Sequence, residues 1–276
     1  MIVFALYQAA APAFHAFGGK FFFSNVWDPV QLHFGAAAFV YGTVVSSLIA
    51  LAIAVPVSIG TALFLTELSP QFLRGPIGFL VEMLAAIPSV VYGLWGIFVL
   101  APAIRTYIEP VLAKYLGFLP LFQGAPFGIG MMSAGIILAI MITPTITAIC
   151  REVFRSIPTL LREGALALGA TRWEMIILGV IKPGLSGIFG AIILGLGRAI
   201  GETMAVTMLI GNKPSISLSL FEPASTMASV IANEYAEAND ALHLSSLAAI
   251  GLALFFVSLL VNSISRFIIW RVSRVE

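Results

Sequence analysis

Charged residues are scarce in this sequence. Aspartate, glutamate, lysine and arginine make up 10% of its 276 residues, and hydrophobic residues make up 60%. In soluble domains about a quarter of the residues are charged. The mean hydropathy is +1.05, which predicts a polytopic membrane protein. The net charge of +1 provides no general attraction to nucleic acid or to an acidic substrate.

Cysteine and histidine are rare as well. Cys150 is the single cysteine, so an internal disulfide is excluded, and no clustered histidine or cysteine accompanies it as a metal site would require. We expect Cys150 to be a small apolar residue at a helix end. The three histidines, His15, His33 and His243, are scattered along the chain, and we expect them at membrane interfaces rather than in a catalytic site.

The glycine-rich motif that cradles ATP phosphates is missing. Neither Gly18-Gly19-Lys20 nor Gly211-Asn212-Lys213 has the spacing or the following hydroxyl of G-x-x-x-x-G-K-[ST]. The H-E-x-x-H and G-x-S-x-G motifs of hydrolases do not occur either. We therefore expect no enzyme activity and no cofactor in this chain. Any ATP and Mg²⁺ that drive transport would be bound by another chain.

What the sequence does contain is a series of long uncharged runs. About twenty apolar residues form a helix that crosses a hydrocarbon core of about 30 Å. Residues 1–17 are apolar but barely that long, so we expect a shortened N-terminal helix there and one membrane domain over 18–276. The fold class predicted is all-α. The five expected spans are 35–66, 76–104, 128–150, 183–212 and 241–270.

Proline, glycine and polar residues predict where these spans bend or stop. Pro56 is expected to kink the first span, and 67–75 is expected to form a tight turn. Pro88-Ser89 is expected to break the run at 76–104. The charged, glycine- and proline-rich segment 105–127 predicts a connector. In the polar segment 213–240, the sequence MASVIANEYAEA at 227–238 predicts a short surface helix.

The distribution of basic residues predicts the orientation in the membrane. Cytoplasmic loops carry an excess of lysine and arginine. Four bases lie on the opposite side of the expected spans, and Arg198 lies inside the fourth span. We therefore expect the charged loop at 151–183 and the C-terminus to be cytoplasmic. The nine bases on that side are Arg74, Arg151, Arg155, Arg162, Arg172, Lys182, Arg266, Arg271 and Arg274.

The charged loop has the signals of a helical hairpin. Pro158-Thr159 suits a helix start, and Gly169 is placed to end that helix in the left-handed conformation. Thr171 and Glu174 have the spacing of a capping box for a second helix. The loop is therefore predicted to be two short helices joined by a tight glycine turn.

Two interpretations of this hairpin remain open on the residues alone. It is either a solvated connection between two spans or a docking surface for another protein. Gly164 and Ala165 favour docking, because small residues leave a shallow surface that a partner's groove can receive.

Arg198 and Glu202 are the charged residues of the fourth expected span. Four residues apart on a helix, they would share one face and could pair. The structural interpretation is a salt bridge that fixes helix packing. The functional hypothesis is that Arg198 binds an oxyanion, because a guanidinium presents several donors in a fork, while Glu202 orients it. Ionisable residues in membrane spans are functional candidates by default.

Two weaker signals also lie in expected membrane spans. Gly197-x-x-x-Gly201 fits a small-residue contact face for a second helix. Glu82 is a further acidic residue in an expected span, and we interpret it as structural.

The charged loop also carries a resemblance. The spacing E-G-A-x-x-x-G, formed by Glu163, Gly164, Ala165 and Gly169, resembles the EAA loop of ABC-transporter permease subunits. Further stretches resemble the phosphate-transport permease family, which is of the PstC type, from about Trp27 to the end. The chain departs from that family's usual loop ending by placing proline at Pro183, one position late. The matching stretches are TELSP (66–70), AAIPSVVYGLWG (85–96), EGALALGATRWE (163–174), GLGRAIGETMAVT (195–207) and ANEYAEA (232–238).

The resemblance implies a fold, a cargo and partners. The fold would be that of type I importer permeases, which is MetI-like, and the cargo would be inorganic phosphate. Arg198 and Glu202 would line the substrate pathway. Glu163, Gly164, Ala165 and Gly169 would dock on a dimer of PstB-like ATPase subunits. A PstA-like second permease subunit and a PstS-like extracytoplasmic phosphate-binding protein, docking on outer loops that include 227–238, would complete the complex in the cytoplasmic membrane.

Two other functions stay open. A permease for another oxyanion, such as sulfate or molybdate, would have the same architecture. A secondary transporter or an intramembrane enzyme would need no ATPase partner, and the EAA-like loop argues against that class.

Overall fold

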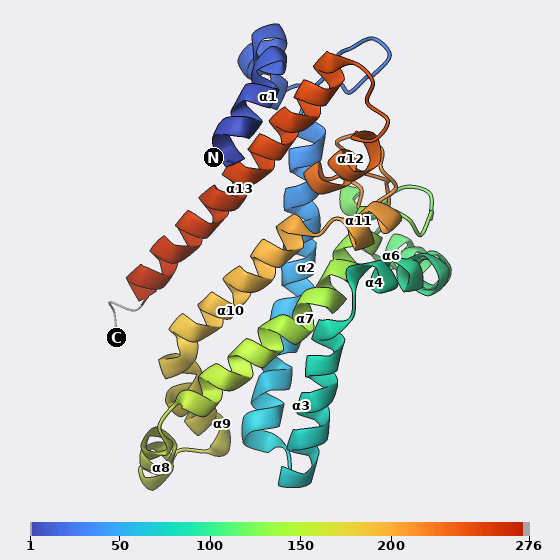
Figure 1. The fold of residues 1–276 in the computed structure, drawn as a ribbon. Coiled ribbons are helices and arrows are strands. Elements are labelled where there is room, and N and C mark those ends of the chain that lie inside the picture. The colour runs from blue at the N-terminus through green and yellow to red at the C-terminus, as the bar shows by residue number, and fades with distance from the viewer. Residues whose placement is uncertain (1, 273–276) are drawn as a thin grey trace. The chain divides into compact units, whose positions relative to one another are not determined.

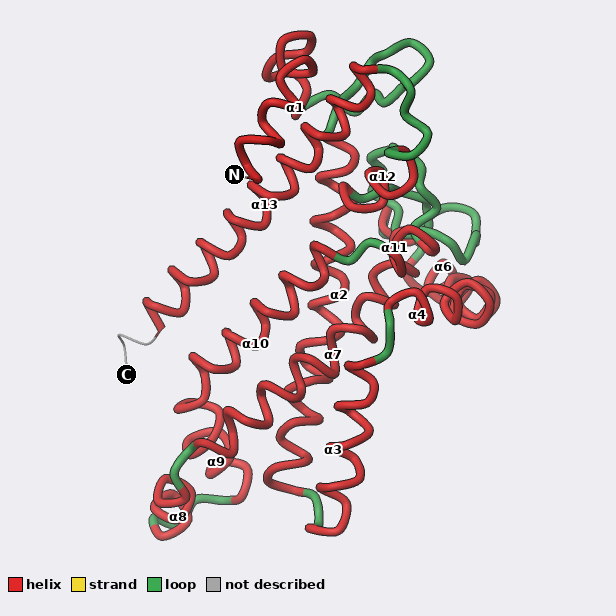
Figure 2. Tube along the Cα trace, in the orientation of Figure 1, coloured by secondary structure: helices red, strands yellow, loops and turns green. Residues whose placement is uncertain are grey.

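The computed structural model describes residues 2–272, and over that range the chain forms helices and loops without a strand (Figure 2). Five helical stretches within that range are long and apolar enough to cross a membrane, so the prediction of an all-α polytopic protein is confirmed. They are Ala37–Leu68, Ser89–Leu116, Met131–Ser156, Arg172–Gly201 and Ala241–Phe267.

Figure 1 labels the α-helices except the short α5. In chain order they are α1 (Ile2–Phe17), α2 (Ala37–Leu63), α3 (Gln71–Ala86), α4 (Ser89–Trp95), α5 (Ala101–Ala103), α6 (Glu109–Leu116), α7 (Met131–Ser156), α8 (Thr159–Ala167), α9 (Arg172–Ile176), α10 (Lys182–Gly201), α11 (Met204–Leu209), α12 (Met227–Glu234) and α13 (Ala241–Val272). Turns of 3₁₀-helix occur at η1 (Gly18–Phe22) and η5 (Pro120–Phe122), and π-helical turns at η2 (Phe64–Leu68), η3 (Gly96–Leu100), η4 (Ile104–Ile108) and η6 (Ile177–Ile181).

The chain divides into two compact units. The first unit comprises Met1–Ala50, Pro88–Leu138 and Ala199–Leu259. The second unit comprises Leu51–Ile87, Ala139–Arg198 and Leu260–Glu276. The charged loop predicted at 151–183 therefore belongs to the second unit.

In the first unit, aromatic and small side chains form a buried core. Phe21, Phe34 and Phe39 pack with residues of α1, α12 and α13, where alanines allow the helices to approach closely. The first four residues of α12, Met227 to Val230, are buried. The expected surface helix at 227–238 is thus present but half-buried, because its apolar start joins this core.

Also in the first unit, the expected connector at 105–127 is largely wrong. Residues 101–116 are helical, so the second span runs over Ser89–Leu116 and includes Arg105 and Lys114. The carboxylate of Glu109 is 1% exposed and accepts hydrogen bonds from the backbone N–H of Gly128 at 3.0 and 3.2 Å. Burial of this acidic residue is tolerated because its oxygens are satisfied by the backbone.

In the second unit, one expected boundary is wrong. The first span continues through η2 to Leu68, so the tight turn expected over 67–75 shrinks to Ser69-Pro70 before α3 begins. The break expected at Pro88-Ser89 is confirmed, because α3 ends at Ala86 and α4 begins at Ser89. A proline disfavours the helical conformation of the residue before it, which explains why the helix breaks at Ile87.

Glycines of α10 pack against α7 in the second unit (Figure 1). A Cβ at Gly187 would lie 2.5 Å from the side chain of Val153, and a Cβ at Gly195 would lie 2.6 Å from that of Ile146. By contrast, none of the described residues has an atom within 4 Å of a Cβ position at Gly197 or Gly201. The close helix contact therefore uses other glycines than the predicted pair.

Two smaller expectations about α7 and α9 are corrected. Cys150 is buried as expected, but it lies inside α7 rather than at a helix end. The second short helix of the hairpin does not end, because α9 continues through η6 into α10, with Pro183 near the start of α10. A proline lacks the N–H of a helical hydrogen bond, and a π-helical turn directly before it accommodates that loss.

Candidate functional site

The predicted helical hairpin is present in the second unit, at the end of α7 (Figure 1). Helix α8 begins at Thr159, directly after Pro158, and Gly169 has a positive φ of 85°. The N–H of Gly169 donates to Leu166 O, and that of Ala170 donates to Ala165 O. This is the glycine-terminated helix end that the sequence predicts, because a left-handed residue costs glycine least.

The capping box at the start of α9 is also confirmed. The N–H of Glu174 donates to Thr171 Oγ1 at 3.3 Å, and the N–H of Thr171 donates to Glu174 Oε2 at 2.7 Å. Each side chain thus satisfies a backbone donor that the first turn leaves free. The two ends of the tight turn are fixed by local hydrogen bonds.

The hairpin presents apolar side chains outward. Glu163 and Gly164 are exposed, and Ala165 is half-buried. No atom lies within 4 Å of a Cβ position at Gly164, so the surface there is open. Leu160 is 76% exposed and Leu168 is 92% exposed. These leucines leave an apolar surface on the hairpin that no described residue covers.

Arg162 ties this hairpin to neighbouring elements of the second unit. Its guanidinium bonds Oε1 of Glu67 in η2, with Nη2 at 2.9 Å and Nε at 3.2 Å. It also donates to the backbone carbonyls of Phe154 and Ile157, each at 2.7 Å. One side chain therefore joins α8 to the end of the first span and to the end of α7.

A second ion pair crosses the same unit. Nη2 of Arg151 in α7 donates to Oε1 of Glu82 in α3 at 2.5 Å. Gly78 makes room for this guanidinium, because a Cβ there would lie 2.4 Å from Nη1 of Arg151. The structural interpretation of Glu82 is thus supported.

The predicted pathway residue Arg198 is half-buried near the end of α10. Its Nη1 donates to the hydroxyl oxygen of Thr145 in α7 at 3.0 Å. Among the described residues of the second unit, no carboxylate forms an ion pair with it. A neutral hydroxyl orients the guanidinium without cancelling its charge, which leaves donors for an anion.

Glu202 does not lie on the helix face expected for it. Helix α10 ends at Gly201, so the four-residue spacing on one helix face does not apply to Arg198 and Glu202. Instead, Oε1 of Glu202 accepts a hydrogen bond from the N–H of Ala205 at 3.4 Å, at the start of α11. A carboxylate there satisfies a free backbone donor of a helix N-terminus. Helix α10 therefore does not extend to Glu202, as the predicted pairing on one helix requires.

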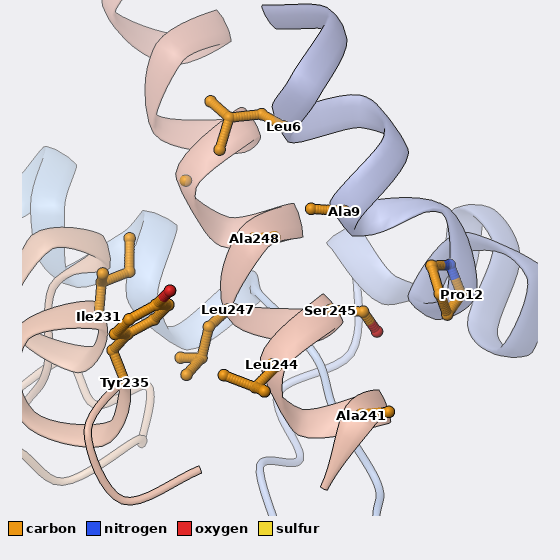
Figure 3. A pocket seen from close by; sticks show the side chains of 11 residues that line it. Leu6, Ala9, Pro12, Ile231, Tyr235, Ala241, Leu244, Ser245, Leu247 and Ala248 are labelled. Atoms are coloured by element: carbon orange, nitrogen blue, oxygen red, sulfur yellow. The ribbon is translucent and has the colours of Figure 1, made fainter. Parts of the chain in front are cut away.

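An apolar hollow of the first unit offers no anion site. It measures about 450 Å³ and lies between α1, α12 and α13 (Figure 3). Its lining has no charged side chain, and Tyr235 and Ser245 supply its hydroxyls. Elsewhere in residues 2–272, no group of three or more His, Cys, Asp or Glu side chains could hold a metal ion.

Residues 54–274 match the family of binding-protein-dependent transport system inner membrane components. This match covers most of the chain. The chain belongs to that family. It is accordingly a multi-pass membrane component of an ABC transporter complex.

Curated relatives of this permease component are similar over nearly its full length. The phosphate transport system permease protein PstC of Pasteurella multocida (strain Pm70) is 49% identical over 268 residues, covering 96% of this chain and 83% of the relative. The probable phosphate transport system permease protein PstC of Methanocaldococcus jannaschii is 38% identical over 272 residues, covering 95% of this chain and 85% of the relative.

Solved structures support the fold of the permease component. The inward-facing MetNI methionine ABC transporter matches with a TM-score of 0.58 at 18% identity, covering 84% of this chain and 91% of that chain. A bacterial ABC transporter that imports the acidic polysaccharide alginate matches with a TM-score of 0.58 at 19% identity, covering 84% and 79%. The predicted MetI-like permease fold is therefore confirmed.

Sequence reasoning about the permease component missed the contacts made over long separations. Glu67 and Arg162 are 95 residues apart, and Arg198 and Thr145 are 53 residues apart. One signal for the first pair was present, because Glu67 is a carboxylate at the end of an otherwise uncharged span.

Proposed function

We propose that this chain is the membrane-spanning permease subunit of an ATP-driven importer that carries inorganic phosphate across the cytoplasmic membrane into the cell. The observation that carries the proposal is its 49% identity, over 96% of its length, to a protein named as a phosphate transport system permease.

Arg198 is the proposed anion contact on the pathway. It is half-buried and oriented by the hydroxyl of Thr145, so its positive charge is held in place. A phosphate that enters a path of low dielectric loses hydration, and a charge-assisted hydrogen bond to a guanidinium offsets part of that loss. Glu202 directly follows the last residue of α10. A change in where this helix ends would move the carboxylate and so alter the negative charge near the proposed pathway.

The hairpin of α8 and α9 is the proposed ATPase contact. Glu163 and Gly164 are exposed beside the outward-facing Leu160 and Leu168, and Gly169 sets the turn. A groove on each of two PstB-like ATPase subunits, which bind the ATP and Mg²⁺, would receive such a helix from each permease subunit. The excess of basic residues on this side supports a cytoplasmic hairpin and C-terminus.

Two further partners complete the proposed complex. A PstA-like permease subunit would pack on this chain, and a PstS-like binding protein would deliver phosphate to its outer loops. Because Met227 to Val230 are buried, the docking surface within 227–238 narrows to its exposed end, which includes Tyr235 and Glu237.

The test is uptake of radiolabelled phosphate by cells that depend on this chain, with and without excess sulfate or molybdate. We expect ATP-dependent uptake that the other oxyanions do not block, and we expect Arg198→Ala to abolish it while the complex still assembles. Arg155→Ala, which changes an exposed arginine of the same unit, is the matched control. Strong inhibition by sulfate or molybdate would move the assignment to another oxyanion, and normal uptake by Arg198→Ala would remove that residue from the pathway.

A further inference from the structure

We propose that Glu67 and Arg162 form a latch that makes the coupling helix α8 and the end of the first span move as one body. Arg162 is then a positioning residue for energy coupling, distinct from the exposed residues that touch the ATPase. The inference rests on the proposed function, because it concerns how movement of α8 reaches the membrane.

The two side chains of the latch are largely buried. The side chain of Arg162 is 17% exposed and that of Glu67 is 9% exposed. Four hydrogen bonds of 2.7 to 3.2 Å leave the guanidinium, two to Glu67 and one each to the carbonyls of Phe154 and Ile157. A planar guanidinium can satisfy these acceptors together, which an ammonium cannot do.

The position of the acceptors explains what the latch connects. Phe154 lies in the last turn of α7, where carbonyl groups have no partner within the helix. A positive charge there also interacts favourably with the helix dipole. Glu67 lies in η2, the end of the helix that begins as α2. The latch thus holds α8 to the ends of two spans at once.

Helix α8 has little apolar packing of its own, since no residue of α8 is buried. Its backbone approaches η6, where a Cβ at Gly179 would lie 3.2 Å from Leu161 O and 3.4 Å from the Cα of Arg162. The polar contacts of Arg162 add a direct side-chain link from α8 to Glu67 and to the end of α7.

The surroundings make Glu67 hard to replace. A cavity of about 320 Å³ beside the latch is lined by Arg74, Arg155 and Arg162, and Glu67 is the one carboxylate among its lining residues. Arg74 is held separately, because its Nε donates to Ser69 O at 3.0 Å. Loss of Glu67 would leave like charges facing one another without a counter-charge.

The test uses the permease assembled with its ATPase and binding-protein partners in liposomes, and it measures ATP hydrolysed per radiolabelled phosphate transported. The variants are Glu67→Gln, Arg162→Lys, Arg162→Met and the double variant Glu67→Gln/Arg162→Met, in which neither member of the pair remains charged without the other. Arg155→Met is the control, because Arg155 lines the same cavity but is exposed and, among the described residues, pairs with Glu152 of its own helix at 3.3 Å rather than with Glu67.

We expect the latch variants to co-purify with the ATPase and to hydrolyse ATP, while the ratio of ATP to phosphate rises at least about 5-fold, within the usual range of coupling between sites. Arg162→Lys should give an intermediate ratio, and Arg155→Met should keep the original one. An unchanged ratio in the double variant would overturn the latch. Failure of both Arg162→Lys and the double variant to assemble would show a role in folding and overturn it as well. Absence of phosphate transport by the unaltered complex would instead contradict the proposed function.

Discussion

Nε1 of Trp27 lies 2.9 and 3.1 Å from the two carboxylate oxygens of Glu234, which follows 207 residues later in the chain. Nε2 of His243 lies 2.9 Å from one of the same oxygens. The carboxylate of Glu234 therefore joins three segments of the first unit: the loop after η1, the end of α12 and the start of α13.

This junction leads to a first prediction about stability. Glu234→Ala should lower the free energy of unfolding by about 1–3 kcal/mol, because it removes the acceptor of the partly buried Trp27 and His243 groups. Thermal unfolding of the purified protein in detergent measures the loss. Glu237→Ala, at an exposed position nearby, should change stability by less than about 0.5 kcal/mol. Equal stability of both variants would contradict the proposed importance of the junction.

A second prediction concerns the packing of α7 on α10 in the second unit. Gly187→Ala places a Cβ 2.5 Å from Val153, so the helices must separate, at a cost of about 1–3 kcal/mol. Gly190→Ala meets no atom within 4 Å and should stabilise the helix by about 0.5–1 kcal/mol, because alanine loses less backbone entropy. The two alanine variants should thus shift the unfolding temperature in opposite directions, and shifts of the same sign would contradict the packing.

A third prediction concerns the turn of the hairpin. Gly169 has a φ of 85°, a conformation that costs alanine about 1 kcal/mol or more. Gly169→Ala should therefore weaken association with the ATPase subunits, whereas Gly169→Asn should retain more of it, because asparagine tolerates this conformation better. Co-purification of the ATPase with each variant measures the difference. Identical recovery with alanine and asparagine would argue against a docking surface set by this turn.

Local signals predicted local structure well in this chain. The start of α8 after Pro158, its end at Gly169 and the capping box of Thr171 and Glu174 were all predicted, because each depends on residues a few positions apart. The spans themselves were found because long apolar runs have few alternatives in a membrane.

Boundaries and partners were harder to predict, for physical reasons. Helix α10 ends at Gly201, and the carboxylate of Glu202 accepts a hydrogen bond at the start of α11 instead, which a periodic pattern does not reveal. The chain is helical through 101–116 despite its charged residues, because the carboxylate of Glu109 accepts a hydrogen bond from the backbone N–H of Gly128. The partners of Arg162 and Arg198 come from distant segments, and a single sequence contains no information on which segments meet.

The π-helical turn η6 has a consequence for the direction in which Arg198 points. Each residue of an α-helix advances the rotation about the axis by about 100°, and a π-helical turn holds one residue more than an α-helical one. The added residue between Ile177 and Ile181 therefore rotates α10 by about 100° relative to the phase that an uninterrupted helix from α9 would have. This single residue is far in sequence from both Arg198 and Thr145. It nevertheless sets the side of α10 on which Arg198 lies, and that side faces Thr145.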